Sequence, residues 1–306
     1  MRAFSLVFAS GLAASAPLLA RSAHAYCRTT TCDPTLDPQG CAPRDDCATR
    51  GEALFWPDAC VTYAVQLRGS ALQGISGYEL DAVMQRAFLA WLRVDCPGGG
   101  RPSLGVIPLG GATCDRVEFN PPLEGHAGAP NANIVIFRDD GWPYPDERFV
   151  IARTSLTFDV HTGVIYDADI EINSFDNEFS TDDEVITTDL QAVLTHEVGH
   201  FIGLDHSTFE KATMQANYDL FNLSARTLSS DDVAGMCSIY APRDDPQPGC
   251  PPGTGPRNGF SRECGTDARA DASCLSIATT PSNGSAWLGL AIGALAWARR
   301  QRRCGS

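Results

Sequence analysis

The fold and chemistry expected of this chain follow from one stretch, His196-Glu197-Val198-Gly199-His200-Phe201-Ile202-Gly203-Leu204-Asp205-His206. His196 and His200 are four residues apart, so a helix carries both imidazoles on one face, about one turn from each other, where they can bind one zinc ion. Glu197 follows the first ligand, so its carboxylate can reach a zinc-bound water without occupying a ligand position. Because zinc lowers the pKa of that water toward about 7, Glu197 can take its proton as the general base.

A catalytic zinc site needs a third protein ligand, and Gly203 allows the chain to supply it. Glycine adopts the left-handed backbone conformation that ends a helix and turns the chain sharply. The turn brings His206 back toward the same metal. Three neutral imidazoles and an open position for water are typical of a catalytic zinc site rather than a structural one. Half of the six histidines of the chain lie in this stretch, which argues against a helix with surface histidines.

These residues resemble the motif of the metzincin zinc peptidases, and Ser207 after the third histidine is similar to the matrixin branch. The resemblance implies that Met214 lies in a tight turn beneath the zinc site and that Tyr218 forms a wall of the S1′ pocket. It covers residues 53–243, which we therefore expect to form a matrixin-like catalytic domain with one catalytic zinc.

The resemblance also implies the activity, which is zinc-dependent hydrolysis of internal peptide bonds. A protein or peptide substrate is expected to pair with the strand Phe149–Phe158 at the edge of the cleft. Glu197 would activate the water and then pass the proton to the leaving amine. Two alternatives stay open: a catalytically inactive zinc-binding surface module, and a non-proteolytic stalk protein that acts through its acidic, Cys-rich parts.

The expected fold class is α+β, metzincin-like, with a twisted mixed five-stranded sheet, two long helices and a small C-terminal lobe after Gly203. Periodicity and capping signals predict the elements along the chain. They are a strand at 60–67, a helix opened by Ser76 and Glu79, strands at 116–120, 132–138, 149–159 and 164–173, the zinc-binding helix, and a helix at 230–240 capped by Ser229 or Ser230.

The two ends of the chain have compositions unlike the middle. Residues 1–25 are typical of a signal peptide, with Arg2, an apolar run and small residues before a cleavage site at Tyr26. Residues 244–284 are a Pro/Gly/Cys-rich linker or stalk. Residues 285–306 resemble the sorting tails of myxobacterial surface proteins, in which Cys274 would be part of the signal, or else form an amphipathic or core helix. We therefore expect a secreted or surface-attached protein.

The chain has 12 cysteines, and behind a signal peptide so many predict disulfides. The segment 26–52 is Cys-rich, and its cysteine spacing lacks the close pairs of zinc ribbons. One of its cysteines could instead keep the zinc latent, but disulfide use is the favoured interpretation. Further along, we predict that Cys96 pairs with Cys114 and that Cys60 can reach Cys237.

The net charge of −14 argues against nucleic acid as a partner, and we expect a monomer. Animal-type matrixins, which the chain resembles, use extra histidines for a structural zinc, but here only His161 lies near the matching strands and Asp167-Ala168-Asp169 stands where a histidine would be expected. Only one zinc is therefore expected, and His161, like His126, is interpreted as a surface or packing residue. Six acids are either calcium ligands or solvated surface groups, namely Asp139, Asp140, Asp167, Asp169, Asp182 and Asp183.

Overall fold

A computed structural model describes most of the chain between Ala25 and Pro242. The described residues are 25–32, 37, 40, 41, 47, 49–58, 60–117, 132–147, 149–184, 186–217, 222–242, 250, 251, 254, 255, 260 and 264. The predicted signal peptide up to residue 24, most of the 244–284 linker with Cys274, the tail 285–306, and His126 lie outside these residues.

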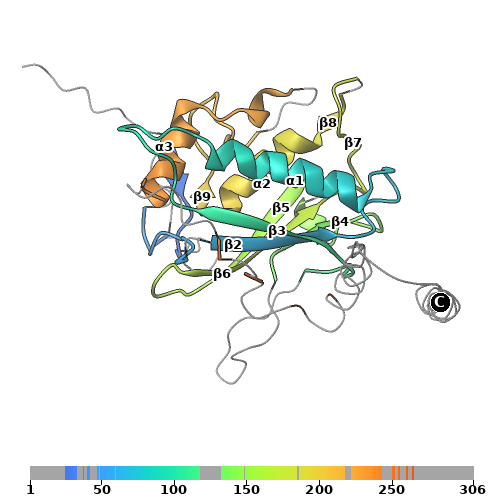
Figure 1. Cartoon of the computed structure of the whole chain (residues 1–306), viewed down its shortest axis with the longest axis horizontal. Coiled ribbons are helices and arrows are strands. Elements are labelled where there is room, and N and C mark those ends of the chain that lie inside the picture. The colour runs from blue at the N-terminus through green and yellow to red at the C-terminus, as the bar shows by residue number, and fades with distance from the viewer. Residues whose placement is uncertain are drawn as a thin grey trace, which may run out of the picture. The chain divides into compact units, whose positions relative to one another are not determined.

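A five-stranded mixed sheet forms the base of the fold, as expected (Figure 1). Its order is β3-β2-β4-β6-β5, in which β5 is antiparallel to β6 and every other neighbouring pair is parallel. Among the described residues β5 therefore lies at an edge of the sheet, and β6 is its one partner strand. The strands are β2 (Cys60–Gln66), β3 (Gly105–Ala112), β4 (Ile134–Phe137), β5 (Ala152–Phe158) and β6 (Ile165–Ile172).

Two long helices, α1 (Gly77–Leu92) and α2 (Leu190–Phe201), lie along one face of this sheet (Figure 1). α1 begins where predicted, because the Ser76 hydroxyl accepts from the Glu79 N–H at 3.2 Å while the Glu79 carboxylate accepts from the Ser76 N–H at 2.8 Å. α1 packs over β2 and β3, whereas α2 packs over β5 and β6. The helix that carries the histidines is therefore held beside the edge strand.

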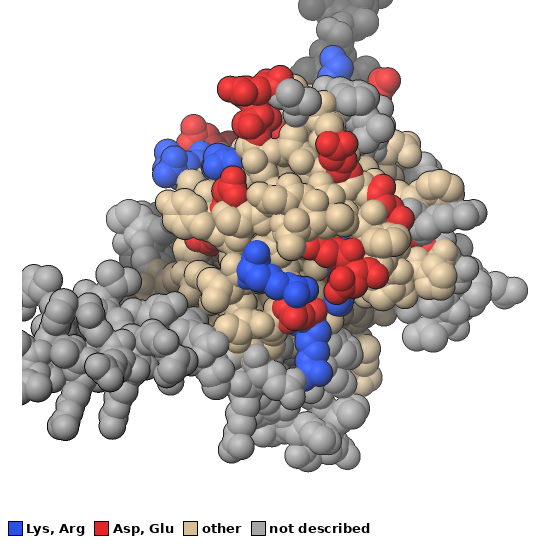
Figure 2. Space-filling model, turned by 90° about the vertical axis from the view of Figure 1, so that its right-hand side faces the viewer, with Lys and Arg blue, Asp and Glu red and all other residues tan. Residues whose placement is uncertain are grey.

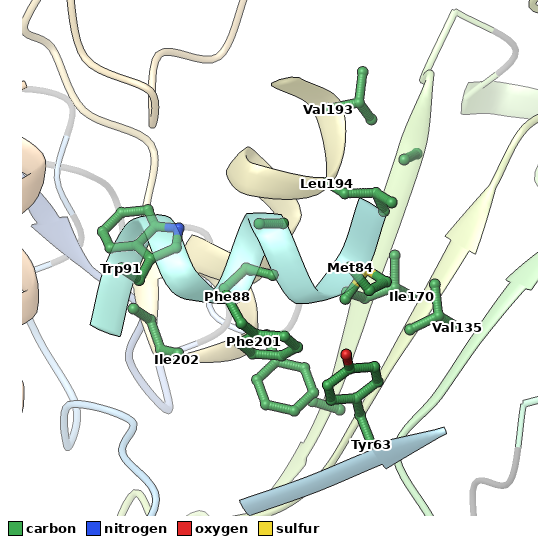
Figure 3. Close-up of a cluster of buried hydrophobic side chains, with 14 of the residues drawn as sticks. Tyr63, Met84, Phe88, Trp91, Val135, Ile170, Val193, Leu194, Phe201 and Ile202 are labelled. Atoms are coloured by element: carbon green, nitrogen blue, oxygen red, sulfur yellow. The ribbon is translucent and has the colours of Figure 1, made fainter. Parts of the chain in front are cut away.

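Aromatic side chains fill the space between the helices and the sheet (Figure 3). Tyr63 from β2 stacks on Phe88 from α1 with ring centroids 4.8 Å apart, and Phe88 meets Phe201 of α2 edge-on at 5.2 Å. Trp91 is fully buried and donates its indole N–H to the Thr195 carbonyl at 2.8 Å. This contact joins α1 to α2 directly before the first histidine, so the core fixes the position of the site.

Short elements complete the fold. A third helix, α3 (Ser230–Ile239), begins at the predicted cap Ser229, whose hydroxyl accepts from two backbone N–H groups. The remaining elements are the strand pairs β1 (Cys27–Arg28) with β9 (Leu204–Asp205) and β7 (Phe179–Ser180) with β8 (Thr188–Asp189), and the 3-10 turns η1 (Pro145–Glu147) and η2 (Ser224–Arg226). Among the described residues, no helix is both long and apolar enough to cross a membrane.

The strand predicted at 116–120 is wrong for its described part, since Arg116 and Val117 lie outside the strands and residues 118–120 are not described. The strand at this point is β3, Gly105–Ala112, in a Gly- and Pro-rich sequence. Pro108 cannot donate to a neighbouring strand, but β3 is the other edge of the sheet, where proline is tolerated. Glycine and proline are disfavoured in strands by local preference, so this strand depends on its place in the sheet.

The predicted disulfide pairings are also wrong. Cys96 pairs with Cys237, not with Cys114, because the loop after α1 meets the end of α3, where the Ser103 N–H donates to the Tyr240 carbonyl at 3.2 Å, and the two Cα atoms lie 5.8 Å apart. Cys60 pairs with Cys250 in the linker, not with Cys237. In the Cys-rich segment, Cys27 pairs with Cys47 and Cys32 with Cys41. These four cysteines are therefore in disulfides, as the favoured interpretation predicts, and none of them is available as a zinc ligand.

Candidate metal centre

The helix α2 places two histidines side by side. Its N-cap Asp189 accepts from the Ala192 N–H at 2.6 Å, which fixes the first turn. Two turns further on, the rings of His196 and His200 have centroids 4.8 Å apart, and their Nε2 atoms lie 3.1 Å from each other. Both Nε2 atoms therefore point to the same place beside the helix, as the four-residue spacing predicts.

Gly203 turns the chain so that His206 reaches the same place. Its φ of +99° is in the left-handed region, and a Cβ at this position would lie 2.5 Å from the Leu54 carbonyl oxygen. Any other residue would be strained and would also clash with backbone. The His206 ring lies 4.8 Å from the His200 ring and 5.2 Å from the His196 ring, and one nitrogen from each histidine lies within 4.8 Å of the other two.

Backbone carbonyls set the tautomer of the two helical histidines. His196 Nδ1 lies 2.7 Å from the Thr213 carbonyl oxygen, and His200 Nδ1 lies 2.9 Å from the Leu204 carbonyl oxygen. A carbonyl oxygen only accepts, so each Nδ1 carries the proton and each Nε2 presents its lone pair. This is the second-shell arrangement that orients imidazole ligands toward a metal.

The environment keeps these imidazoles neutral. Burial, followed by the proximity of His200, lowers the pKa of His196 to about 4. Burial and the nearby His206 lower the pKa of His200 to about 4, and the pKa of His206 itself is lowered by burial and by His196. Three neutral imidazoles on one point match the donor set of a catalytic zinc ion, so the residues fit the metal that the sequence suggests.

Glu197 lies beside the histidines with only 5% of its surface exposed. Burial raises the pKa of its carboxyl group, against the opposing influence of His196 and of a hydrogen bond from Thr154. The Thr154 hydroxyl, on β5, lies 2.6 Å from Glu197 Oε2 and 3.1 Å from the Glu197 carbonyl oxygen. It has one proton to donate, and the shorter distance assigns that proton to the carboxylate.

Thr154 was not identified from the sequence. The only signal was that it lies in the strand expected at the cleft edge, where alternate side chains face inward. Its function as a partner of the carboxylate depends on the packing of β5 against α2, which the sequence does not specify.

Met214, for which the sequence resemblance implies a turn beneath the zinc site, packs against α2. Its side chain is 1% exposed and lies against Gly199, because a Cβ at Gly199 would be 2.1 Å from Met214 Sδ and 2.9 Å from Trp91 Cζ2. The Ser207 N–H donates to the Met214 carbonyl at 2.7 Å, which closes the loop that begins after His206. The absence of a side chain at Gly199 therefore leaves the room that the Met214 side chain occupies.

The carboxylate of Asp232 holds this turn from α3. It accepts from the Thr213 N–H at 2.8 Å and from the Met214 N–H at 3.1 Å. Its neighbour Asp231 accepts from the Ser207 hydroxyl at 2.7 Å. The Thr213 carbonyl in turn accepts from His196, so a continuous chain of hydrogen bonds links α3 to a predicted metal ligand.

A cleft runs past the three histidines. Its walls come from β5 and the residues before it, from α2, and from the loop after His206 as far as η2. Tyr218, which the sequence resemblance places in the S1′ wall, lies outside the described residues. The neighbouring residues Gln215, Ala216 and Asn217 do line the cleft.

The six acids considered for calcium do not form a shared site among the described residues, where the three histidines are the only group of three or more possible ligands that converge. Asp167 and Asp169 are buried on β6, so they are not solvated surface acids. Burial alone would raise the pKa of the Asp139 carboxyl group, but hydrogen bonds from Ser174, from Ser70 and from the backbone together lower it. His161 is exposed in the turn after β5.

Comparison with known proteins agrees with this geometry. Residues 134–241 match the family model described as Matrixin. The chain is 43% identical to the Macrophage metalloelastase of Oryctolagus cuniculus over 61 residues, which are 20% of this chain and 13% of that protein. It is 27% identical to the Metalloendoproteinase 1-MMP of Arabidopsis thaliana over 191 residues, 61% of this chain and 44% of that protein.

A third relative is the Matrix metalloproteinase-19 of Homo sapiens, which is 39% identical over 90 residues, 28% of this chain and 18% of that protein. The chain thus spans less than half the length of each of these relatives. The matched region begins at β4 and ends after α3, and it contains the whole three-histidine site. The mixed sheet with two long helices is therefore a matrixin-like α+β fold.

Proposed function

We propose that this matrixin-like chain is a zinc-dependent endopeptidase whose catalytic domain covers residues 53–243. The observation that carries the proposal is the convergence of His196, His200 and His206 beside the buried carboxylate of Glu197. A zinc ion held by these imidazoles would polarise a peptide carbonyl and acidify a water molecule. The remaining chemistry belongs to residues of the chain.

Glu197 is placed to move the proton. Its carboxylate lies next to the histidines at the cleft surface, and burial raises the pKa of the carboxyl group, which makes it a better proton acceptor. Thr154 holds one carboxylate oxygen, which leaves the other free to accept a proton from water and to return it to the leaving amine. Met214 and Asp232 support this arrangement from below.

The edge strand β5 supports cleavage of internal bonds rather than of chain ends. The side of its backbone away from β6 lies at the cleft, and an extended peptide can pair with it as an additional strand. Thr154, opposite Glu197, is the third of the seven residues of β5, so the strand continues in both directions from the reacting carboxylate. A bound peptide would therefore extend past the site on both sides.

Substitution of Glu197 tests the proposal. Glu197→Gln keeps the size of the side chain and a hydrogen-bond acceptor for Thr154, but it removes the base. We expect it to bind one zinc per chain, as the wild type does, and to cleave casein at least about 100-fold more slowly, since a general base contributes at least that factor. Retained cleavage would overturn the assignment of the base. Stoichiometric zinc in a wild type without turnover would favour the inactive surface module.

Secretion is a further part of the proposal. The four disulfides among the described residues are typical of an oxidising compartment, which agrees with a signal peptide before Tyr26. Sequencing the N-terminus of the protein released by its native host tests this, and an intact Met1 would contradict it. Surface attachment through residues 285–306 stays a prediction, tested by locating the protein with and without that tail.

A further inference from the structure

The loop that carries His206 is paired along its backbone with the start of the Cys-rich segment. β1 and β9 are antiparallel, with Cys27 opposite Asp205 and Arg28 opposite Leu204. The Thr29 N–H donates to the Gly203 carbonyl at 3.1 Å. Three consecutive residues of this segment, Cys27 to Thr29, therefore pair with the three residues directly before His206.

Thr29 also reaches the hydrogen bond that orients His200. Its hydroxyl donates to the Leu204 carbonyl oxygen at 2.9 Å, and the same oxygen accepts from His200 Nδ1 at 2.9 Å. A carbonyl oxygen has two lone pairs, so it can accept both bonds. The hydroxyl thus helps to hold the carbonyl that sets the tautomer and the direction of the imidazole.

The segment is itself anchored on both sides of Thr29. The Cys27–Cys47 disulfide precedes it and the Cys32–Cys41 disulfide follows it. The Thr29 carbonyl accepts from the Leu54 N–H at 2.9 Å, and Leu54 is fully buried in the main core. Two paired residues cannot form a stable ladder alone, so the disulfides and the core hold this one in place.

We propose that the stapled segment, residues 27–32 with Cys41 and Cys47, is a positioning element of the metal centre. It restrains the turn at Gly203 and the strand β9, and so keeps His206 aimed at the two helical histidines. Thr29 is the residue through which it acts on His200. The proposal rests on the proposed function only in that the three histidines bind a metal ion.

Substitutions of Thr29 isolate the side-chain contact. Thr29→Val keeps the branched shape suited to a strand but loses the hydroxyl, whereas Thr29→Ser keeps the hydroxyl. Changes in the partners of metal-binding histidines cost about 10- to 100-fold in metal affinity. Thr29 holds this partner carbonyl rather than the imidazole, so we expect Thr29→Val to lie at the lower end of that range and to bind zinc about tenfold more weakly in competition with a chelator. Thr29→Ser should be close to wild type.

Removal of the Cys27–Cys47 disulfide tests the whole segment, with removal of Cys60–Cys250, which joins β2 to the linker, as the matched control. Each double Cys→Ser variant loses one disulfide, but only the first disulfide includes a residue, Cys27, of the strand that pairs with β9 next to His206. Both should lower the melting temperature of the metal-free protein. Only the first should weaken zinc binding of the folded protein and change the visible absorption of bound cobalt(II).

Equal zinc affinity in Thr29→Val and Thr29→Ser, or equal losses in the two disulfide variants, would overturn the proposal. If a disulfide variant does not fold, the Thr29 pair decides alone. Because no substrate is involved, a wild type that binds zinc but cleaves nothing would contradict the proposed function and leave this inference standing. If instead Thr29→Val and the Cys27–Cys47 variant cleave peptides and bind zinc as tightly as the wild type, this inference would fail and the proposed function would stand.

Discussion

Replacing Gly199 by alanine should damage the metal centre although the residue itself supplies no metal ligand. The new methyl group would lie 2.1 Å from Met214 Sδ, 2.9 Å from Met214 Cε and 2.9 Å from Trp91 Cζ2. Met214 is 1% exposed and Trp91 is fully buried, so neither side chain has solvent-filled space into which it can move. The turn that contains Met214 must shift instead.

Two effects of opposite sign determine how much Gly199→Ala changes the free energy of unfolding. Alanine in a helix interior is favoured over glycine by about 1 kcal/mol. Overpacking a filled core costs about 1–3 kcal/mol, and a contact as short as that with Met214 belongs at the upper end. We therefore expect a net loss of about 2 kcal/mol in the free energy of unfolding. Zinc affinity should fall as well, because the Thr213 carbonyl beside Met214 accepts from His196.

The assay is urea unfolding of the metal-free protein, with Gly199→Ala measured alone and together with Met214→Ala. In the second background only the contact with Trp91 remains, so the same substitution should be close to neutral. The two backgrounds should thus differ by about 2 kcal/mol, a coupling of the size seen between residues in contact. A Gly199→Ala protein that is as stable as wild type, or an equal effect in both backgrounds, would refute the reasoning.

Three further outcomes are expected. Thr154→Val should lower kcat for peptide cleavage about tenfold with little change in KM or zinc content, because a hydrogen bond to a charged group contributes about 1.5–3 kcal/mol. Thr154→Ser keeps the hydroxyl and should restore kcat. Equal kcat values for the two variants would contradict the function of Thr154 as a partner of the Glu197 carboxylate. Arg226→Ala should lower the free energy of unfolding, measured with urea, by about 3 kcal/mol, since it leaves the fully buried Asp189 carboxylate without its bidentate guanidinium. Arg226→Lys keeps a positive charge and should lose less stability. An Arg226→Ala protein as stable as the wild type would contradict this contribution of the ion pair. The metal-free protein should lose stability as the pH falls from about 6.5 toward about 4, because the unfolded chain binds protons at two imidazoles whose pKa is lowered to about 4 by folding. Measuring this with Glu197→Gln removes the opposite contribution of the raised carboxyl pKa, and a flat profile in that variant would show that the imidazoles are not shielded by the fold.

Local sequence was sufficient wherever neighbouring residues determine the structure. The capping box of Ser76 and Glu79 predicted the start of α1, because both hydrogen bonds lie within one turn. The spacing of His196 and His200 predicted a shared direction for the two imidazoles, because the helix repeat alone sets it. Gly203 predicted the sharp turn for the same local reason, and its φ of +99° agrees.

Segments that are distant along the chain meet only in the folded structure, and there the sequence was insufficient or misleading. Cys96 pairs with Cys237 across 141 residues, although Cys114 is much nearer along the chain. β3 is a strand because a neighbouring strand and the edge position accept its proline and glycines, which overrides their local preference.

The sequence by itself determined which groups can carry the chemistry, since side-chain type and helical spacing decide what can bind zinc and accept a proton. Only the tertiary structure decided how those groups are held. The hydroxyl of Thr154 on Glu197, the space that Gly199 leaves for Met214, and the hold of Thr29 on the His206 loop all join residues more than ten positions apart. Such contacts depend on how helices, strands and disulfides pack in three dimensions, and no local pattern in the chain records them.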